Sequence, residues 1–372
     1  MNSILFLAPS VTKHSLTRPL AFALLFKDEH EACIAGPAVK GEPIFIEEPG
    51  IVYRRIEQEG IMAQVICAFR IARDYDVVVA CDDRLYGALA GCLARLYGKR
   101  FIYDTGEDLM AVHRFDMKIL QGKRKMMKII TWPLSALTVF CRRFAHQVTV
   151  STKLLQKKIG GEICPIPVDV NFFSRGNGEA IRKRYRRPLI VHIGTIQRHK
   201  GLDTLVKAFK IVEEKIPSAT LLMVGSTQGS PGYFNRLEQQ VKKEKQHIHF
   251  TGTVRSNDET RDYLAAADCL VVMSEENPIH NVQFPIKLGL SMGARKPIVA
   301  ARVGSIPDIL GDAGVLVDPT AEAVAQGIIL VLQDEERATA MTEKIFRRAQ
   351  QTISFEALKG RLQRYYFGDT PN

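Results

Sequence analysis

Short apolar runs alternate with longer amphipathic stretches along the whole chain. This alternation predicts parallel β-sheets whose strands are joined by crossover helices. In the first half, the predicted strands are Ile4–Ala8, Ala32–Ala35, Val77–Ala80, Phe101–Tyr103 and Gln147–Val150. In the second half, they are Leu189–Ile193, Thr220–Val224, Ile248–Phe250, Cys269–Met273, Ile298–Ala300 and Val315–Val317. Helices are predicted at Ile56–Ala72, Tyr86–Leu96, Leu202–Val212, Tyr233–Lys243 and Phe355–Tyr366.

The length of 372 residues predicts two domains, because one hydrophobic core usually stops growing below this size. A basic stretch with few apolar residues, Ser174–Arg187, separates two series of predicted strands. We therefore expect two doubly wound, Rossmann-like α/β domains at residues 1–175 and 188–372. No strand follows the last predicted helix, which is free to cross back to the N-terminal domain.

Composition narrows the class of protein. With 46% hydrophobic and 24% charged residues, the chain is typical of a globular protein. The net charge of +11 favours phosphates, nucleic acid or an anionic membrane as partners. The seven cysteines form no CxxC pair, and most lie in apolar runs, so we expect a reduced, cytoplasmic chain without disulfides or zinc. The N-terminal SILFLAPS is interpreted as a first strand rather than a signal peptide.

One candidate for anion binding opens the second half of the chain, in IVHIGTIQRHKGLDTLVKAF. A predicted strand ends at Gly194, a loop carries Arg198 and Lys200, and Gly201 opens a helix. The free backbone N–H groups and the positive dipole end of such a helix suit an anion, and the two basic side chains would add charge. A solvated loop that is merely basic remains an equal alternative.

Two further segments lie at the same predicted sheet edge. In FPIKLGLSMGARKPIVA, Pro285 suits the first position of a helix that follows the strand Cys269–Met273. The segment HIHFTGTVRS places a glycine turn after the strand Ile248–Phe250. Ligands of open α/β sheets bind at the carboxyl edge, so the three segments predict a shared site there. An ordinary packed helix is the alternative for the first of them.

These three segments, in this order, resemble the C-terminal domain of retaining glycosyltransferases of family 4 (glycosyl transferases group 1). The matching stretches are Gly194–Gly201, Phe250–Val254 and Pro285–Ala300, followed by VGSIPDIL and GVLVDP. The first half is similar only more weakly, in DVVVACDD and FIYDTGEDL. The resemblance implies a GT-B fold, in which two Rossmann-like domains face each other across a cleft. It also implies transfer of a sugar from a nucleotide-sugar donor, without cofactor or metal.

The resemblance also implies site residues. Lys200 matches a lysine that contacts the donor diphosphate, Thr253 and Val254 lie beside the nucleobase, and the helix start at Pro285 faces the phosphates. The full set of implied donor-binding positions is Gly194, Thr195, Arg198, Lys200, Thr253, Val254, Gln283, Pro285, Ile286, Lys287 and Leu290. The catalytic residue is unknown, with Lys200, Arg198 and Glu107 as candidates.

Three positions depart from the family pattern. The glutamate that holds the donor ribose corresponds to Leu290, and the arginine after the first glycine corresponds to Thr195. A histidine of the N-terminal domain corresponds to Gly106, which Glu107 follows. These departures leave altered donor use or loss of catalysis open.

A basic segment in the first half, Arg114–Arg143, interleaves positive and apolar residues and carries the chain's single tryptophan, Trp132. A segment of this kind suits an anionic membrane surface. The family resemblance favours this partner, because many such enzymes act on lipid-linked acceptors, and the contacts would come from Lys123, Arg124, Lys125, Lys128 and Trp132. Nucleic acid is not expected, because no recognised nucleic-acid module is present. A core helix with a solvated basic face is the other alternative.

The sequence thus predicts a retaining, metal-independent glycosyltransferase that is cytoplasmic and peripheral at the inner face of the membrane. Its acceptor would be lipid-linked or a polysaccharide, as in polysaccharide or lipopolysaccharide synthesis. A non-catalytic GT-B subunit that scaffolds a partner transferase is the main alternative, and a GT-B sugar-nucleotide epimerase is a third. The donor sugar, its base, the acceptor and the oligomeric state are not determined by the sequence.

Overall fold

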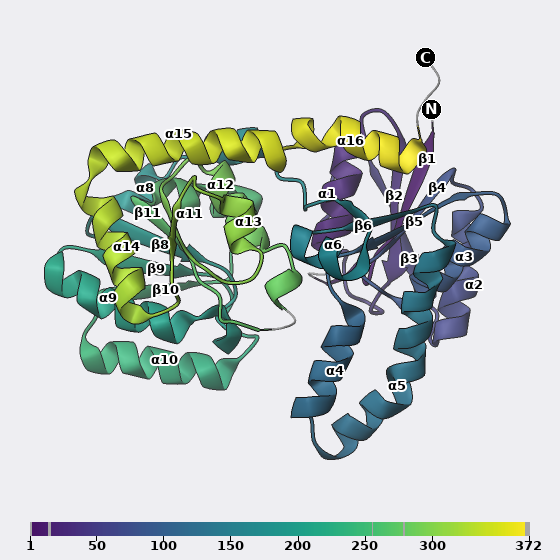
Figure 1. The fold of residues 1–372 in the computed structure, drawn as a ribbon, viewed down its shortest axis with the longest axis horizontal. Coiled ribbons are helices and arrows are strands. Elements are labelled where there is room, and N and C mark those ends of the chain that lie inside the picture. Colours follow the sequence, from purple (N-terminus) through teal and green to yellow (C-terminus); the bar gives the residue numbers. More distant parts are fainter. Residues whose placement is uncertain (1, 14–15, 255, 278–279, 369–372) are drawn as a thin grey trace. The chain divides into compact units, whose positions relative to one another are not determined.

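A computed structural model describes residues 2–13, 16–254, 256–277 and 280–368. These residues form two compact units (Figure 1). Unit 1 comprises the described residues up to Pro167 together with the segments 280–284 and 355–368. Unit 2 comprises those from Val168 to Asn277 and from Pro285 to Ser354. The chain therefore passes from one unit to the other several times.

Unit 1 is built on a parallel sheet with the described strand order β3-β2-β1-β4-β5-β6-β7. Its strands are β1 (Ser3–Leu7), β2 (Glu31–Pro37), β3 (Ile51–Ile56), β4 (Val77–Cys81), β5 (Arg100–Thr105), β6 (Gln147–Val150) and β7 (Glu162–Ile163). Its helices are α1 (Thr17–Phe26), α2 (Ile61–Ala72), α3 (Leu85–Leu96), α4 (Leu109–Ile119), α5 (Gly122–Phe140), the 3₁₀ turn η2 (Cys141–Phe144), α6 (Lys153–Ile159), η4 (His280–Val282) and α16 (Phe355–Phe367).

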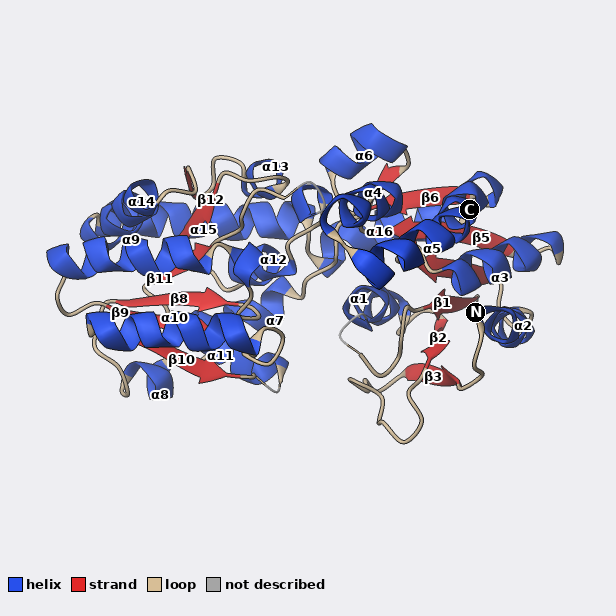
Figure 2. Cartoon of the chain, turned by 90° about the horizontal axis from the view of Figure 1, so that it is seen from below, coloured by secondary structure: helices blue, strands red, loops and turns tan. Residues whose placement is uncertain are grey.

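Unit 2 has a second parallel sheet, with the described order β10-β9-β8-β11-β12-β13 and helices on both faces (Figure 2). Its strands are β8 (Leu189–Ile193), β9 (Thr220–Val224), β10 (Ile248–Gly252), β11 (Cys269–Val272), β12 (Ile298–Ala301) and β13 (Val315–Val317). Its helices are α7 (Val170–Ser174), α8 (Glu179–Arg182), η3 (Arg198–Lys200), α9 (Leu202–Lys215), α10 (Pro231–Glu244), α11 (Asn257–Ala266), α12 (Ile286–Gly293), α13 (Ile306–Leu310), α14 (Ala321–Gln333) and α15 (Glu335–Thr352).

The central strands explain why both sheets form. Every residue of β4 (VVVAC) and of β9 (TLLMV) is buried. Continuous apolar strands of this kind are typical of parallel sheets covered by helices on both faces. The predicted doubly wound α/β class is confirmed in both units.

The structure differs from the sequence prediction in three places. Residues 51–56 form β3 rather than the start of a helix, so α2 begins at Ile61. The short strand β7 was not predicted. The predicted boundary at 174–187 lies inside unit 2, where α7 packs on α12 and α8 packs on α11, so the change of unit comes earlier, at Pro167.

The final helix, α16, belongs to the core of unit 1. Leu358, Leu362 and Tyr366 are buried in one apolar cluster with Phe6 of β1 and Phe22 of α1. All seven cysteines are free. None of the described helices has the length and apolar character needed to cross a membrane.

Candidate functional site

The candidate donor site lies in unit 2, where the strand order reverses. The chain leaves the central strand β8 in one direction toward β9, whereas β11 lies on the other side of β8. At such a switch point, the loops after the two strands diverge and leave room for a ligand. The relevant loops are those from β8 to α9 and from β11 to α12.

The loop after β8 is shaped by two glycines. Gly194 lies against Gly225 so closely that a methyl group on Gly225 would stand 2.1 Å from the Gly194 carbonyl oxygen. Gly201 has φ +70, a left-handed conformation that glycine adopts at little cost, and it places η3 directly before α9. Ile196 is fully buried between them and anchors the loop. Lys200 is thereby fixed at the start of α9.

The loop after β11 lies beside the first. The Glu275 backbone N–H donates to the His199 carbonyl oxygen at 3.2 Å. This loop leads to α12, whose first turn carries Lys287 and has no side-chain cap. The Lys287 ammonium group donates a hydrogen bond to the Met273 carbonyl oxygen at the end of β11. Both loops therefore bring a lysine to the same edge of the sheet.

The two lysines are poorly compensated by negative charge. Two effects lower the pKa of Lys287 to about 7: burial, which is the larger, and the positive charge of Lys200. Burial also lowers the pKa of Lys200 from its ordinary value. Two ammonium groups held close together without a carboxylate partner are stabilised when an anion binds between them. This arrangement suits a phosphate or diphosphate.

A buried histidine completes this edge. His192 of β8 is fully buried, and its Nδ1 lies 3.0 Å from the Val271 carbonyl oxygen, to which it donates. Burial and the charges of Lys287 and Lys200 hold the His192 pKa well below its usual range, so the ring is neutral. Its Nε2 is buried and has no hydrogen-bond partner among the described residues. The sequence analysis missed His192, although a polar residue inside the apolar run PLIVHIG was a visible signal.

The remaining predicted donor-binding residues of unit 2 lie on several different segments. Thr195 follows Gly194 in the same loop, and Arg198 is exposed at the start of η3. Pro285 and Ile286 begin α12, on which Leu290 is partly buried. Thr253 and Val254 follow β10, the edge strand two positions from β8. All of these residues therefore lie in loops or at helix starts of this carboxyl edge, except Leu290, which lies one turn inside α12.

Two predicted residues, Glu107 and Gln283, lie in unit 1 instead. The Gln283 side-chain amide donates to the Glu107 carboxylate at 3.1 Å. The segment that carries Gln283 is fixed by a hydrogen bond of 2.6 Å from the Thr152 hydroxyl to the Val282 carbonyl oxygen. Sequence reasoning could not pair these residues, because they are far apart along the chain.

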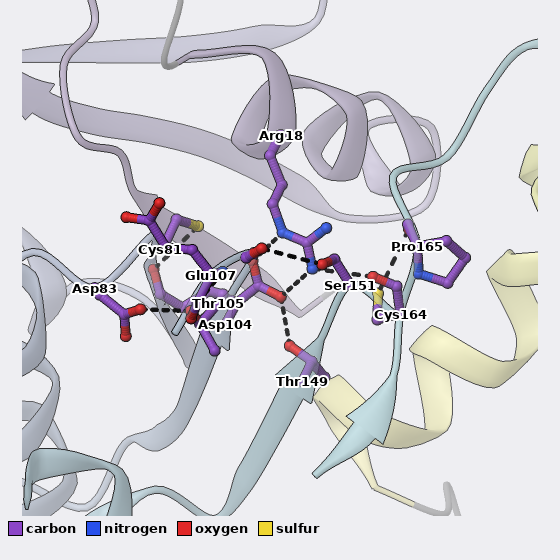
Figure 3. Close-up of polar contacts among 12 residues, drawn as sticks. Arg18, Cys81, Asp83, Asp104, Thr105, Glu107, Thr149, Ser151, Cys164 and Pro165 are labelled. Carbon is purple, nitrogen blue, oxygen red and sulfur yellow. Dashed lines mark hydrogen bonds and ion pairs between the residues drawn. The ribbon is translucent and has the colours of Figure 1, made fainter. Parts of the chain in front are cut away.

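Unit 1 has its own polar cluster at the carboxyl ends of β4 and β5, shown in Figure 3. Arg18 of α1 forms a two-point ion pair with Asp104 of β5, with both N–O distances at 2.7 Å. The Thr149 hydroxyl donates to Asp104 at 2.6 Å, and Arg18 also donates to the Cys164 carbonyl oxygen at 3.0 Å. Both charged side chains are buried, so this pair organises the interior of the unit.

Two aspartates follow β4 in this cluster. Asp82 and Asp83 both have positive φ, which is uncommon outside glycine and concentrates at functional positions. Asp83 accepts hydrogen bonds of 2.5 Å from the Tyr103 and Thr105 hydroxyls, yet burial raises its pKa to about 6. Burial raises the pKa of Asp82 to about 7. Among the described residues, no group of histidine, cysteine and acidic side chains is arranged to hold a metal ion.

Comparison with known proteins identifies the domain that holds the two lysines. A model of the family described as glycosyl transferases group 1 matches residues 187–334. Residues 187–334 are therefore similar to the group 1 glycosyl transferases. The match covers the loops after β8 and β11, and so includes Lys200 and Lys287.

Curated relatives align over the same part of the chain. The D-inositol 3-phosphate glycosyltransferase of Thermomonospora curvata is 27% identical over 216 residues, which cover 54% of this chain and 49% of the relative. A GDP-mannose-dependent alpha-(1-6)-phosphatidylinositol monomannoside mannosyltransferase of Mycobacterium tuberculosis is 29% identical over 174 residues, 43% of each chain. The chain thus spans about half the length of the curated relatives it matches.

Solved structures extend the likeness in fold to both units. Anabaena HepE in complex with UDP has a TM-score of 0.74 and 18% identity, over 97% of this chain and 98% of the other. Sucrose-phosphate synthase from Thermosynechococcus elongatus has a TM-score of 0.71 and 18% identity over the whole of both chains. The region similar to group 1 glycosyl transferases therefore lies in the second half of a GT-B fold.

Proposed function

We propose that this chain is a retaining glycosyltransferase that moves a sugar from a nucleotide-sugar donor to a lipid-linked or glycan acceptor. One observation carries the proposal: Lys200 and Lys287, neither with a carboxylate partner in the described part of the chain, converge at the switch point of the region similar to group 1 glycosyl transferases. The donor is a substrate, and no cofactor is invoked. The UDP bound to HepE supports a nucleotide in this type of fold.

The chemistry follows from the charges. When the bond from the sugar to the diphosphate breaks, negative charge develops on the leaving nucleoside diphosphate. Protonated Lys200 and Lys287 and the uncapped N-terminus of α12 would stabilise that charge more strongly than they stabilise the intact donor. Preferential stabilisation of the developing charge is what accelerates the reaction.

The proposed acceptor comes from two lines of support. A curated relative is named for action on a phosphatidylinositol mannoside, which is a lipid-linked acceptor. The basic segment containing Lys123, Arg124, Lys125, Lys128 and Trp132 is suited to an anionic membrane. We therefore propose a cytoplasmic protein that is peripheral at the inner face of the membrane.

The test of function is turnover of a panel of uridine, guanosine and adenosine diphosphate sugars, with binding measured in parallel. We expect slow hydrolysis of one class of donor, and transfer when extracted membrane lipids are added as acceptors. Proton NMR of the product should show the anomeric configuration of the donor retained. Binding of no donor at all would contradict the proposal.

A non-catalytic subunit is the second candidate, because the family resemblance aligns Leu290 with a glutamate that holds the donor ribose. A leucine side chain cannot accept a hydrogen bond from a ribose hydroxyl. If the pocket is intact, Leu290→Glu is expected to tighten nucleoside diphosphate binding about tenfold, since an unpaired polar group costs about 1–3 kcal/mol. Calorimetric titration of both proteins measures the difference, and weaker binding by the variant would show that another group holds the ribose.

Proton uptake on binding is a further expected result. At pH 8, Lys287 is largely neutral, since its pKa is about 7. A bound diphosphate favours the ammonium form, so binding should take up close to one proton, and affinity should fall as the pH rises above 7. The positive charge of Lys200 contributes to the lowered pKa of Lys287. His192 does not contribute to the uptake, because its pKa is so low that the ring stays neutral throughout this range. The uptake is measured by calorimetry at pH 8 in buffers of different ionisation enthalpy.

The matched variant is Lys287→Met, which keeps the length of the side chain but cannot be protonated. It should bind the diphosphate more weakly and without proton uptake. Uptake that persists in this variant would assign the proton to another group.

A further inference from the structure

The hairpin of α4 and α5 extends away from the sheet of unit 1 (Figure 1). A helix that packs on a protein normally buries its apolar face and exposes its polar face. Helix α5 does the opposite. Its large apolar residues recur three or four positions apart and are all exposed, at 40–60%, at Met126, Ile130, Leu134, Leu137 and Phe140.

Several polar residues of α5 face inward, whereas Lys123, Arg124 and Lys125 at its start are exposed. Lys128 pairs with Asp116 of α4 at 2.6 Å, and the Ser135 hydroxyl lies 3.3 Å from His113 Nδ1 on α4. Thr138 is the buried residue of α5. The apolar face is therefore not a core surface that folding has used, which rules out the core-helix alternative raised by the sequence.

Further exposed apolar side chains lie on α2, α3 and η2, and α3 packs on α2, on α5 and on η2. The Arg95 guanidinium of α3 donates to the Phe144 carbonyl oxygen of η2, and the rings of Phe69 on α2 and Tyr97 after α3 are 6.0 Å apart. Exposed apolar side chains lie on all of these elements. We call this set the apolar band: Ile61, Met62, Ile66, Leu93, Leu96, Tyr97, Met126, Met127, Ile129, Ile130, Trp132, Leu134, Leu137, Phe140 and Phe144.

The helices that carry the band hold charge of one sign, although the exposed Glu57 and Glu59 precede α2. The segments α2, α3, α5 and η2 contain no aspartate or glutamate. Their basic residues are Arg70, Arg95, Lys123, Arg124, Lys125, Lys128, Arg142 and Arg143. A partner that covers the band must therefore be apolar at its centre and negatively charged at its surface.

We propose that the apolar band is seated in the headgroup and upper acyl region of an anionic lipid bilayer. An anionic bilayer offers apolar depth below a negative surface, which complements both properties of the band. A second copy of the chain would instead bring two basic faces together, and nucleic acid would not take up the aliphatic side chains. The inference rests on the proposed function, because membrane seating would bring the protein to a lipid-linked acceptor. Membrane binding itself can be tested without donor or acceptor.

The test uses the protein's single tryptophan, Trp132, which belongs to the band. On vesicles of phosphatidylcholine with phosphatidylglycerol, its emission should shift to shorter wavelength and be quenched by lipids brominated in the acyl chain. Vesicles of phosphatidylcholine alone should produce little change. About 0.5 M salt should weaken the binding, because it screens the basic side chains.

Variants separate the apolar from the electrostatic contribution. Met126→Ser, Ile130→Ser and Leu137→Ser together should lower vesicle partitioning at least about tenfold, while the fold survives because these side chains are exposed. The matched control is Val39→Ser, Val52→Ser and Leu330→Ser together, three apolar residues of 37–40% exposure outside the band. Lys123→Gln, Arg124→Gln and Lys125→Gln together should remove most of the salt dependence. Lys128 is left intact because it pairs with Asp116.

Two outcomes would overturn the inference. One is vesicle binding that the band variant does not weaken relative to the control. The other is absence of binding to the anionic vesicles, and a dimer seen by sedimentation velocity that the band variant dissociates would then assign the band to contact between two copies. Donor turnover without vesicle binding would leave the proposed function standing, whereas vesicle binding without turnover would leave this inference standing.

Discussion

Replacing Asp104 with asparagine is expected to lower the free energy of unfolding of unit 1 by about 3–5 kcal/mol. The change keeps the size of the side chain but leaves the Arg18 guanidinium buried without its counter-charge. Burial alone would lower the pKa of Arg18, yet Asp104 more than offsets this effect and keeps the guanidinium charged. Hydrogen exchange measured on peptides from β4 and β5 reports this unit specifically.

The control for this prediction is Asp74→Asn, which removes the same charge from an exposed position of unit 1 and should change stability by less than about 0.5 kcal/mol. Adding Arg18→Met to Asp104→Asn should restore part of the loss, because no buried charge then lacks a partner. If the double variant is as unstable as the sum of the two single variants, the pair is not coupled as the geometry indicates.

Lys200→Ala is expected to weaken nucleoside diphosphate binding by about 1.5–3 kcal/mol, the contribution of a charge-assisted hydrogen bond. This corresponds to a loss of affinity of roughly 10- to 150-fold. The side chain is partly buried at the switch point, where no solvent shell would replace it fully. Calorimetric titration with uridine, guanosine and adenosine diphosphates measures the change.

Lys207→Ala provides the comparison for Lys200, since it removes the same charge from the exposed side of α9. Its affinity for the diphosphate should stay within about twofold of the unmodified protein. Arg198→Ala should weaken binding comparably to Lys200→Ala if Arg198 replaces the arginine missing at Thr195. Unchanged affinity in Lys200→Ala would remove this lysine from the site.

The elements that the sequence predicted best are those buried on both faces. Strands β4 and β9 are continuous apolar runs, which only a covered parallel sheet explains. Strand β3 was missed because Arg54 and Arg55 interrupt its sequence, IVYRRI. It is the edge strand of its sheet, where an exposed side tolerates charge, so local pattern could not separate it from the helix that follows.

The residues of the two polar clusters also differ in how far the sequence could indicate them. Lys200 and Lys287 could be named as candidates because Lys200 lies in the turn that follows β8 and Lys287 lies in the first turn of the helix that follows β11. The ion pair of Arg18 with Asp104 joins residues 86 positions apart, and neither carries a local signal of its partner. For α5 the sequence left a membrane-facing and a core-facing apolar side both open, because helical periodicity shows that one face is apolar but not which way it points.

The multiple crossings of the chain have a consequence for synthesis on the ribosome. Unit 1 starts first, yet Leu358, Leu362 and Tyr366 of its core are made only after all of unit 2. Until α16 emerges, the surface of Phe6 and Phe22 that it covers stays open to solvent. Unit 2, which needs no residue after Ser354, can close before then. The second unit to be translated is therefore the first that can finish folding, and a nascent chain stalled before residue 355 would carry a completed unit 2 beside an incomplete unit 1.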